Sequence, residues 1–219
     1  MVNNDQIIPA EESGDEALEI ISFISSAVPY IGGPVSNIIS GALTKRKLAR
    51  IREFLLGLAS DLKEFKSTVT EEYVKTDEFE ELLETTLHKV AEERNEQKRQ
   101  IFRSFLEEAI KSPGESYDEQ RRFIHILEQL QDAHIALMKV IIQTPDPNPP
   151  GITGSIGQTL QRRLPNIPRE KIVELLSQLK DLRLAMLADP NMMLTPHGAE
   201  DLRSGLTDYG RRFLKYLKQ

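Results

Sequence analysis

The sequence predicts a mainly α-helical protein in two parts, a bundle of long helices followed by a small winged-helix-like α/β unit. Three observations support this fold class. Apolar residues recur at helical spacing through most of the first 143 residues. A proline-rich segment over 144–151 then stops any regular element. Beyond it, short helical stretches alternate with turn-forming residues, which is the order expected of a winged-helix unit.

The bundle is predicted over residues 15–143, after a flexible N-terminus over 1–14. Its first helix, over 15–28, is broken by Pro29 to Pro34, and a long helix follows over 34–68. A third helix should begin with Asp77 as N-cap and end at Ser112-Pro113-Gly114, and a fourth should begin after Ser116. About four helices result. Long helices with short connections favour an antiparallel bundle.

The polar stretch over 91–100 interrupts the apolar stripe of the third helix for nearly three turns. A helix that is polar on all sides is either exposed or in contact with a polar partner. The first interpretation, a helix that extends past its neighbours, is favoured over a partner surface.

The proline-rich linker over 144–151 separates the bundle from a winged-helix-like domain over 152–219. Within this domain the pattern predicts two helices and, at the C-terminus, a third that is capped by Thr207. The segment between the second and third helices should contain a strand and then a loop or ribbon. The predicted ranges are 155–164 and 168–182 for the first two helices, 183–188 for the strand and 192–203 for the loop or ribbon.

Charge differs between the two parts, although the whole chain carries only −6. From Gly151 onward, eleven Lys/Arg and seven Asp/Glu give +4, so the first 150 residues carry −10. Such a shift suggests different partners for the two parts. The chain has no Cys, and its first residues are polar and acidic rather than a secretory signal. We therefore expect a cytoplasmic protein that can also act at the inner face of the membrane.

Catalytic chemistry is not indicated by the residues available. The four histidines form no metal-binding pair of the kind found in zinc enzymes or di-iron bundles. His134 lies on the apolar stripe of the fourth helix, where a hydrogen-bonded core histidine is favoured over a buried ligand or switch. We therefore expect no catalytic residue, no metal, no cofactor and no small-molecule substrate.

An uncharged run of twenty-five residues extends from Ile20 to Thr44 and is followed by a basic cluster. This length reaches that of a membrane span, and a basic flank is typical of the cytoplasmic side. Because prolines, glycines and serines interrupt the run, a helical hairpin in the bundle core is favoured for the resting protein, with insertion after a conformational switch left open. The residues predicted to contact a membrane or partner are Ile20, Phe23, Ile24, Tyr30, Ile31, Val35, Ile38, Lys45, Arg46 and Lys47.

The C-terminal segment Gly205-Leu206-Thr207-Asp208-Tyr209-Gly210-Arg211-Arg212-Phe213-Leu214 resembles the closing turn and last helix of winged-helix-like domains. In combination with a charged helical front half, it is similar to bacterial proteins of the abortive-infection alpha type. That resemblance implies a role in antiphage defence. The apolar N-terminal helix on a long bundle is also similar, in architecture alone, to the four-helix cell-death domains that act on membranes.

These observations favour a non-enzymatic bacterial defence or cell-death effector or adaptor that acts through a protein partner, self-association or a membrane. A winged-helix transcriptional regulator that binds DNA is the alternative, and a structural oligomerisation protein is a third. In the regulator, the nucleic-acid contacts would come from Arg162, Arg163, Arg169 and Lys171. The flanking Glu170 and Glu174 would repel phosphate, which makes this alternative the weaker one.

Overall fold

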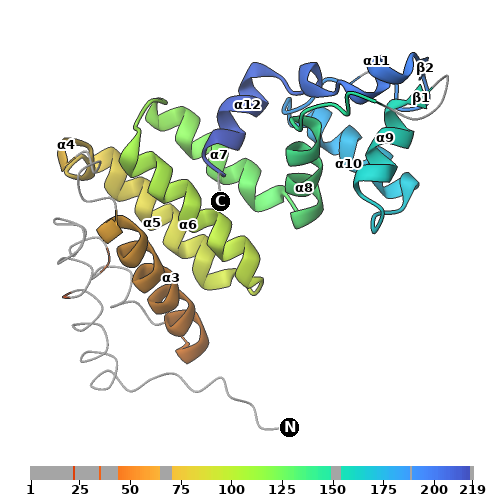
Figure 1. Cartoon of the computed structure of the whole chain (residues 1–219). Helices are drawn as coiled ribbons and strands as arrows, with labels where there is room; N and C mark the ends of the chain where they lie inside the picture. Colours follow the sequence, from red (N-terminus) through yellow and green to blue (C-terminus); the bar gives the residue numbers. More distant parts are fainter. Residues whose placement is uncertain are drawn as a thin grey trace, which may run out of the picture. The chain divides into compact units, whose positions relative to one another are not determined.

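The computed structural model describes residues 44–64, 71–148, 154–187 and 189–217, together with the single positions Ser22 and Val35 (Figure 1). These residues are mainly helical, as the sequence predicts, and include one antiparallel sheet of two short strands. Contacts divide the chain into two compact units: unit 1 extends to Glu128, and unit 2 begins at Gln129. The predicted flexible N-terminus over 1–14 lies outside the described residues, as does the predicted first helix apart from Ser22.

Unit 1 is built from helices that bury one face each. Its helices in the described ranges are α3 (Lys45–Glu64), α4 (Glu71–Val74), α5 (Asp77–Glu92), α6 (Glu96–Lys111) and α7 (Tyr117–Gln129). Helix α3 packs against both α5 and α6, and α5 packs against α6 (Figure 1). The largest side chains in this core are fully buried phenylalanines and aliphatic residues. They include Ile51, Leu55, Leu62, Phe79, Phe102, Phe105 and Phe123.

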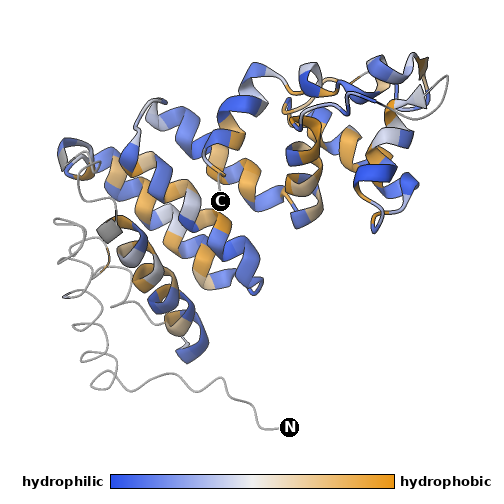
Figure 2. Cartoon of the chain, viewed as in Figure 1, coloured by the Kyte–Doolittle hydropathy of each residue, from blue (hydrophilic) through white to orange (hydrophobic). Residues whose placement is uncertain are grey.

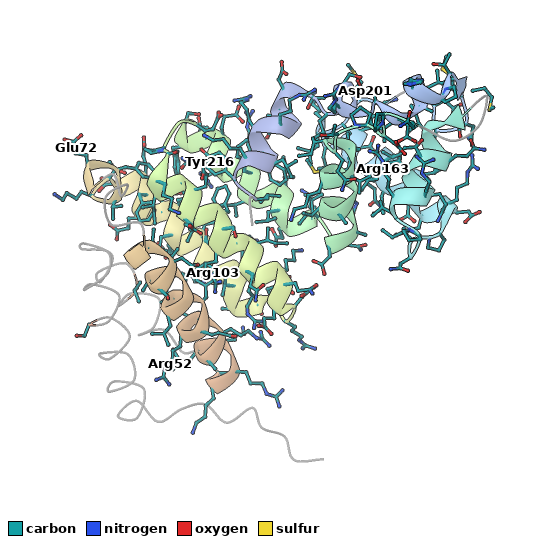
Figure 3. The ribbon with its side chains drawn as sticks, in the orientation of Figure 1. Arg52, Glu72, Arg103, Arg163, Asp201 and Tyr216 are labelled. Atoms are coloured by element: carbon teal, nitrogen blue, oxygen red, sulfur yellow. The ribbon has the colours of Figure 1, made fainter. Side chains whose placement is uncertain are left out.

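The surface of unit 1 is held by ion pairs between neighbouring helices. Arg103 of α6, labelled in Figure 3, pairs with Asp61 of α3 at 2.8 Å, and Arg99 pairs with Glu53 at 2.9 Å. Gly57 of α3 makes the first approach possible, because a Cβ there would lie 2.1 Å from Arg103 Nη1. Exposed pairs of this kind contribute about 0.2–1 kcal/mol each, so apolar burial remains the main stabilising interaction.

The single third helix predicted from Asp77 to Lys111 is wrong, because the chain turns between α5 and α6. Asn95 is the N-cap of α6, and its side-chain oxygen accepts from the N–H groups of Gln97 and Lys98 at 2.9 and 3.4 Å. The polar stretch over 91–100 therefore contains the end of α5, the turn at 93–95 and the first residues of α6, which explains why the apolar stripe stops there.

Capping groups also divide the predicted fourth helix. Ser116 precedes α7, and its Oγ accepts from the Glu119 N–H at 3.4 Å, as the sequence predicts. However, α7 ends at Gln129, and α8 (Asp132–Ile141) begins after the N-cap Gln131. The predicted N-cap Asp77 is also corrected by one residue, because Thr76 caps α5 and accepts from the Phe79 N–H.

Helix α8 belongs to unit 2, although the sequence predicts it as part of the bundle. It is apolar over most of its length, as Figure 2 shows in orange, and six of its ten residues are buried. A helix that is apolar on most sides must be covered on most sides. Both α9 (Ile156–Arg163) and α10 (Arg169–Asp181) pack against it. The division between units therefore falls at Glu128, before the predicted linker over 144–151.

The remainder of unit 2 matches the predicted helices closely and the predicted strands poorly. Strand β1 (Gly154–Ser155) pairs with β2 (Met193–Leu194) in antiparallel register, Ser155 opposite Met193. Of the predicted strand over 183–188, the structure shows one isolated bridge, from Ala185 to Leu206. The predicted loop over 192–203 contains α11 (Pro196–Glu200), and a short 3₁₀ turn (Arg203–Gly205) precedes α12 (Asp208–Lys215).

A tight C-terminal turn of α10 receives the last helix. Arg183 adopts φ 59°, the left-handed conformation that follows many helix ends. Its N–H donates to Lys180 O, and the Leu184 N–H donates to Leu179 O at 2.8 Å. These two bonds form a Schellman motif, and the side chains of Leu184 and Leu179 are both fully buried beside it.

The C-terminal motif docks on this turn. Thr207 donates its N–H to Leu184 O and its hydroxyl to Arg183 O, and as N-cap of α12 it accepts from the Gly210 N–H at 2.9 Å. Gly210 lies against the Leu184 carbonyl, and Phe213 is fully buried. The residues that carry the family resemblance therefore have a structural role within unit 2.

Gly210→Ala should destabilise the protein by roughly 2 kcal/mol or more. Alanine is favoured over glycine inside a helix by about 1 kcal/mol, but the added Cβ would lie 2.0 Å from Leu184 O. Because that oxygen accepts from Thr207, it cannot move without the loss of a hydrogen bond. Thermal unfolding followed by circular dichroism should show a lower Tm.

The matched control is Gly114→Ala, whose added Cβ would meet only Ser112 O, at 3.8 Å. Its Tm should stay within a degree or two of wild type. An unchanged or raised Tm for Gly210→Ala would contradict the docking of α12 described above.

Candidate functional site

Helix α10 presents an unusual outer face. Ile172, Leu175 and Leu179 are fully buried on its inner side. On its outer side a groove of about 330 Å³ runs beside the helix, and Val173, Leu176, Ser177 and Lys180 form one wall of it. Val173 is 38% exposed, which places an apolar residue at the rim rather than in the core. A concave site of this size that combines apolar and polar groups is the kind of place where ligands and partner side chains bind.

The opposite wall is the segment that follows the α10 turn, and backbone contacts hold it in place. It contributes Ala185, Leu187, Asp189 and Pro190. At one end the Met186 N–H donates to Gly205 O at 2.7 Å, and at the other Pro190 O accepts from the Gly157 N–H at 2.9 Å.

Two glycines allow this wall to pack closely. A Cβ on Gly205 would lie 2.3 Å from a methyl carbon of Leu187, and one on Gly157 would lie 3.0 Å from Pro190 O. Asp189 Oδ1 accepts from the Asn191 N–H at 2.9 Å, which stabilises the turn that ends the wall. The described residues of the second wall, Ala185 to Leu187 and Asp189 to Pro190, are therefore held in place by contacts with other parts of unit 2.

Methionines border this segment. Met186 is 73% exposed, Met192 52% and Met193 59%. Together with Val173 and Ile142 they are the large hydrophobic residues that are exposed within the described ranges. A cluster of apolar side chains beside a groove marks an interaction surface more often than an isolated exposed residue does. We refer to Met186, Met192 and Met193 as the methionine rim.

A hydrogen-bond chain sets the position of α10 on α8. The Gln131 N–H donates to His134 Nδ1 at 3.0 Å, so Nε2 carries the proton and donates to Gln178 Oε1. Gln178 Nε2 in turn donates to Glu174, which also binds Lys171 at 2.8 Å. Burial lowers the pKa of His134, and its neutral form satisfies both ring nitrogens. The prediction of a hydrogen-bonded core histidine is confirmed.

Two of the four residues predicted to contact nucleic acid share one ion-pair partner, and the Arg162 side chain remains 45% exposed. Arg162 and Arg163 of α9 both bind Glu200, a carboxylate that is only 2% exposed, and Arg163 is labelled in Figure 3. Thr159 donates to Glu200 at 3.1 Å. Burial raises the pKa of Glu200, but hydrogen bonds from Arg162, Thr159 and Arg163 outweigh it and hold the pKa below its ordinary value. The cluster ties α9 to α11.

The other two predicted nucleic-acid residues lie on α10 and also have partners within unit 2. Arg169 donates to Asn191 Oδ1 at 2.8 Å, which joins the start of α10 to the end of the groove wall. Lys171 pairs with Glu174 on its own helix. Each of the four residues thus has a hydrogen-bond or ion-pair partner within unit 2. Three of them support α9, α10 and the segments that surround the groove.

Few of the residues predicted to contact a membrane or partner fall in the described ranges. Val35 is fully buried, as a core residue would be, and Lys45 and Arg46 are exposed on α3. Lys47 pairs with Glu92 of α5, and the pKa of Glu92 is lowered chiefly by this hydrogen bond. Ile20, Phe23, Ile24, Tyr30, Ile31 and Ile38 lie outside the described residues. Within the ranges that are described, no helix has the length and apolar character needed to cross a membrane.

Unit 1 contains a second cavity, of about 300 Å³, whose lining is mostly charged. Lys89 pairs with Glu128 at 2.7 Å, and Lys98 donates to the Glu128 carbonyl. His88, Glu92 and Glu93 also line it, yet no group of side chains in the described part of the chain has the arrangement of a metal site. The ion pairs across this cavity satisfy its charges, so it offers less to a ligand than the groove beside α10 does.

The sequence contains a partial signal for the groove. Val173 lies one residue after Ile172 and off the apolar stripe of its helix, and three of the five methionines fall between residues 186 and 193. Both features indicate exposed apolar surface. The opposite wall leaves no such signal, because it depends on contacts with Gly157 and Gly205 from distant parts of unit 2.

His134 should make stability depend on pH. Its folded-state pKa lies below the ordinary 6.5, so the unfolded chain binds the proton first as the pH falls. The stabilisation is therefore complete above about pH 6.5 and is lost progressively toward the lower folded-state pKa, with a slope of up to about 1.4 kcal/mol per pH unit. In an NMR titration, the signal of the His134 ring proton should shift with a midpoint below pH 6.5. The Tm should decrease as the pH is lowered from about 7 to about 5.

His134→Asn retains an acceptor near Nδ1 but removes the titration, so its Tm should depend less on pH. His197→Asn is the control, because His197 is exposed on α11 in the same unit. A His134 midpoint above 6.5, or an equal effect of the two substitutions, would contradict this assignment.

Comparison of the chain with protein-family models, with curated proteins and with solved structures gave no match in any of the three. The resemblance to abortive-infection alpha proteins therefore stays a prediction, and function must be argued from the geometry of the site.

Proposed function

We propose that this chain is a non-enzymatic interaction protein whose unit 2 binds a short amphipathic helix of a partner protein in the groove beside α10. The observation that carries this proposal is the groove itself, whose lining combines apolar and polar groups, together with the exposed methionines in and just after the chain segment that forms one of its walls. Methionine side chains are unbranched and polarisable, so they adapt to apolar partners of different shape. A groove with an adaptable rim suits a partner helix that inserts one or two apolar side chains.

The order of elements in unit 2 supports a winged-helix-like interpretation. Helix α8, strand β1, helices α9 and α10 and strand β2 follow one another, and β1 pairs with β2. In this interpretation α10 takes the place of the recognition helix, and the segment from Met186 to Met192 takes the place of the wing. The groove then lies between the two parts that such domains commonly use for recognition.

The chemistry of this surface favours a protein partner over nucleic acid. Phosphate binding needs several cations with few nearby carboxylates. On α10, by contrast, Glu170, Glu174 and Asp181 are exposed along with Arg169 and Lys180. Arg162 and Arg163 are occupied by Glu200. A mixed charge around an apolar centre is the usual composition of a protein interface.

Lys180 determines which charge on a partner helix is favoured. It lines the groove, and within residues 154–187 and 189–217 no carboxylate pairs with it. A partner helix with an acidic residue next to its apolar anchor would therefore be preferred. One buried leucine-sized side chain contributes about 2 kcal/mol. Because association itself costs several kcal/mol, a single helix that inserts one or two such side chains should bind weakly, and its affinity should depend strongly on each of them.

Within this proposal, the resemblance of the C-terminal motif suggests that the adaptor works in antiphage defence. The motif itself has a structural role in docking α12, so it supports the domain type more than the pathway. Action at a membrane through the N-terminal run, and self-association, remain parts of the prediction that the groove does not address.

The test is a titration of the full chain, labelled with ¹³C-methyl methionine, with an amphipathic helical peptide that carries leucines on one face and a glutamate beside them. The signals of Met186, Met192 and Met193 should shift, whereas that of the fully buried Met138 should not. Val173→Glu should abolish the shifts, because it places a charge at the groove. Glu84→Gln, at an exposed position on α5, is the control.

Reversal of the charges on Lys180 and on the peptide tests the preference for an acidic partner. Lys180→Glu should weaken binding of the glutamate peptide and strengthen binding of a peptide with lysine at that position, each by a few-fold. Equal binding of both peptides by wild type, or shifts that survive Val173→Glu, would count against the groove as the binding site.

The alternative of a DNA-binding regulator makes the opposite prediction for Arg169. If α10 reads DNA, a mobility-shift assay at low salt should show tight binding that weakens steeply as salt is added, and Arg169→Ala should reduce it. We expect no such binding, because Arg169 and Lys171 have partners within unit 2. Salt-dependent binding that is lost in Arg169→Ala would overturn the ranking of the two functions.

A further inference from the structure

The methionine rim stands out chemically as well as sterically. The chain has five methionines, no Cys and no Trp, so thioethers are its most readily oxidised side chains. Met186, Met192 and Met193 lie within eight residues and are 52–73% exposed, whereas Met138 in α8 is 0% exposed. Met1 lies outside the described residues. The exposed thioethers in the described ranges therefore all belong to residues 186–193, the same stretch of chain that supplies Leu187, Asp189 and Pro190 to one wall of the groove.

We propose that Met186, Met192 and Met193 form an oxidation site, at which hydroperoxides convert the thioethers to sulfoxides and so switch off binding of the partner helix. This inference rests on the proposed function, since it assigns a regulation to the same groove.

The reaction balances without a further reactant. A lone pair on the methionine sulfur attacks the terminal oxygen of the hydroperoxide, and the O–O bond breaks as the S–O bond forms. The sulfur loses two electrons, and the peroxide gains them. The proton of the attacked oxygen passes to the departing oxygen, which leaves as water from hydrogen peroxide or as an alcohol from an alkyl hydroperoxide.

Oxidation at these positions should change the surface without unfolding the domain. The contacts that hold this segment are made by backbone atoms: Met186 N–H donates to Gly205 O, Met192 N–H donates to Asp189 O, and Met193 pairs with Ser155 in the sheet. More than half of the surface of each of these methionines is exposed, so the added oxygen can remain in water. Oxidation of Met138 would instead place a polar group in the core.

A sulfoxide at the rim would weaken the partner's contact in two ways. It replaces an apolar, adaptable side chain by a polar, chiral one. It also introduces an oxygen that loses its water when the partner helix covers it. Together, the three modifications should raise the Kd of the peptide by about tenfold or more.

The experiment exposes the full chain to a modest excess of hydrogen peroxide and follows the modification by mass spectrometry of peptides and by the ¹³C-methyl methionine spectrum. Met186, Met192 and Met193 should oxidise before Met138, with no change in the circular dichroism spectrum. Affinity for the amphipathic peptide should fall by about tenfold or more. Methionine sulfoxide reductases of both epimer specificities, supplied with a dithiol, should restore it.

Two variants separate this regulation from general damage. The triple variant Met186→Leu, Met192→Leu, Met193→Leu has no thioether at the rim, so the affinity measured for it before treatment should not change in peroxide, whereas Met138→Leu should lose affinity in peroxide as wild type does. If wild type binds the peptide but oxidation leaves its affinity unchanged, the oxidation switch is wrong and the groove stands. If unoxidised wild type does not bind the peptide at all, the proposed function fails and the switch fails with it.

Discussion

The carbonyl group of Leu184 is the point on which the architecture of unit 2 depends. It follows the left-handed residue Arg183 at the end of α10, accepts the backbone N–H of Thr207, and leaves space on its other side for a glycine alone at position 210. The turn thereby fixes where α12 begins, and the next residue, Ala185, bridges to Leu206. The groove wall departs from this junction, so its distance from α10 follows from the same contact that docks the last helix. The contact that docks α12 therefore also positions one wall of the groove.

Charge in unit 2 serves mainly to hold elements together. Glu200 would be costly to bury alone, and two arginines and a threonine from α9 compensate for the loss of water around it. His134 joins α8 to α10 in its neutral form. The excess of positive charge after Gly151, which suggested a different partner for this part of the chain, is thus consumed in part by internal contacts. What remains open around the groove is apolar surface, Lys180 and a few carboxylates.

Local signals in the sequence predicted the elements that local contacts determine. The helices over 155–164 and 168–182 and the cap at Thr207 agree with α9, α10 and α12, because caps and apolar stripes lie within a few residues of one another. The break between α5 and α6 was missed, although Asn95 is a strong capping residue, because a polar run can also be read as an exposed helix. Local sequence patterns could predict neither that α8 belongs to unit 2 nor that the groove exists. Both features depend on Gly157, Gly205 and α9 meeting segments that are distant in sequence.

Methionine at these three positions combines an adaptable apolar surface with a backbone that other contacts hold. An exposed leucine or phenylalanine at Met186, Met192 or Met193 would offer more defined apolar contact, but at fixed shape and with a greater tendency to aggregate. The backbone of this segment is held by Gly205, Asp189 and the β1–β2 pair, whereas the three side chains are more than half exposed. Their side chains are therefore available for recognition. An exposed surface built from the most oxidisable residue type in the chain can respond to an oxidant without loss of the structure beneath it.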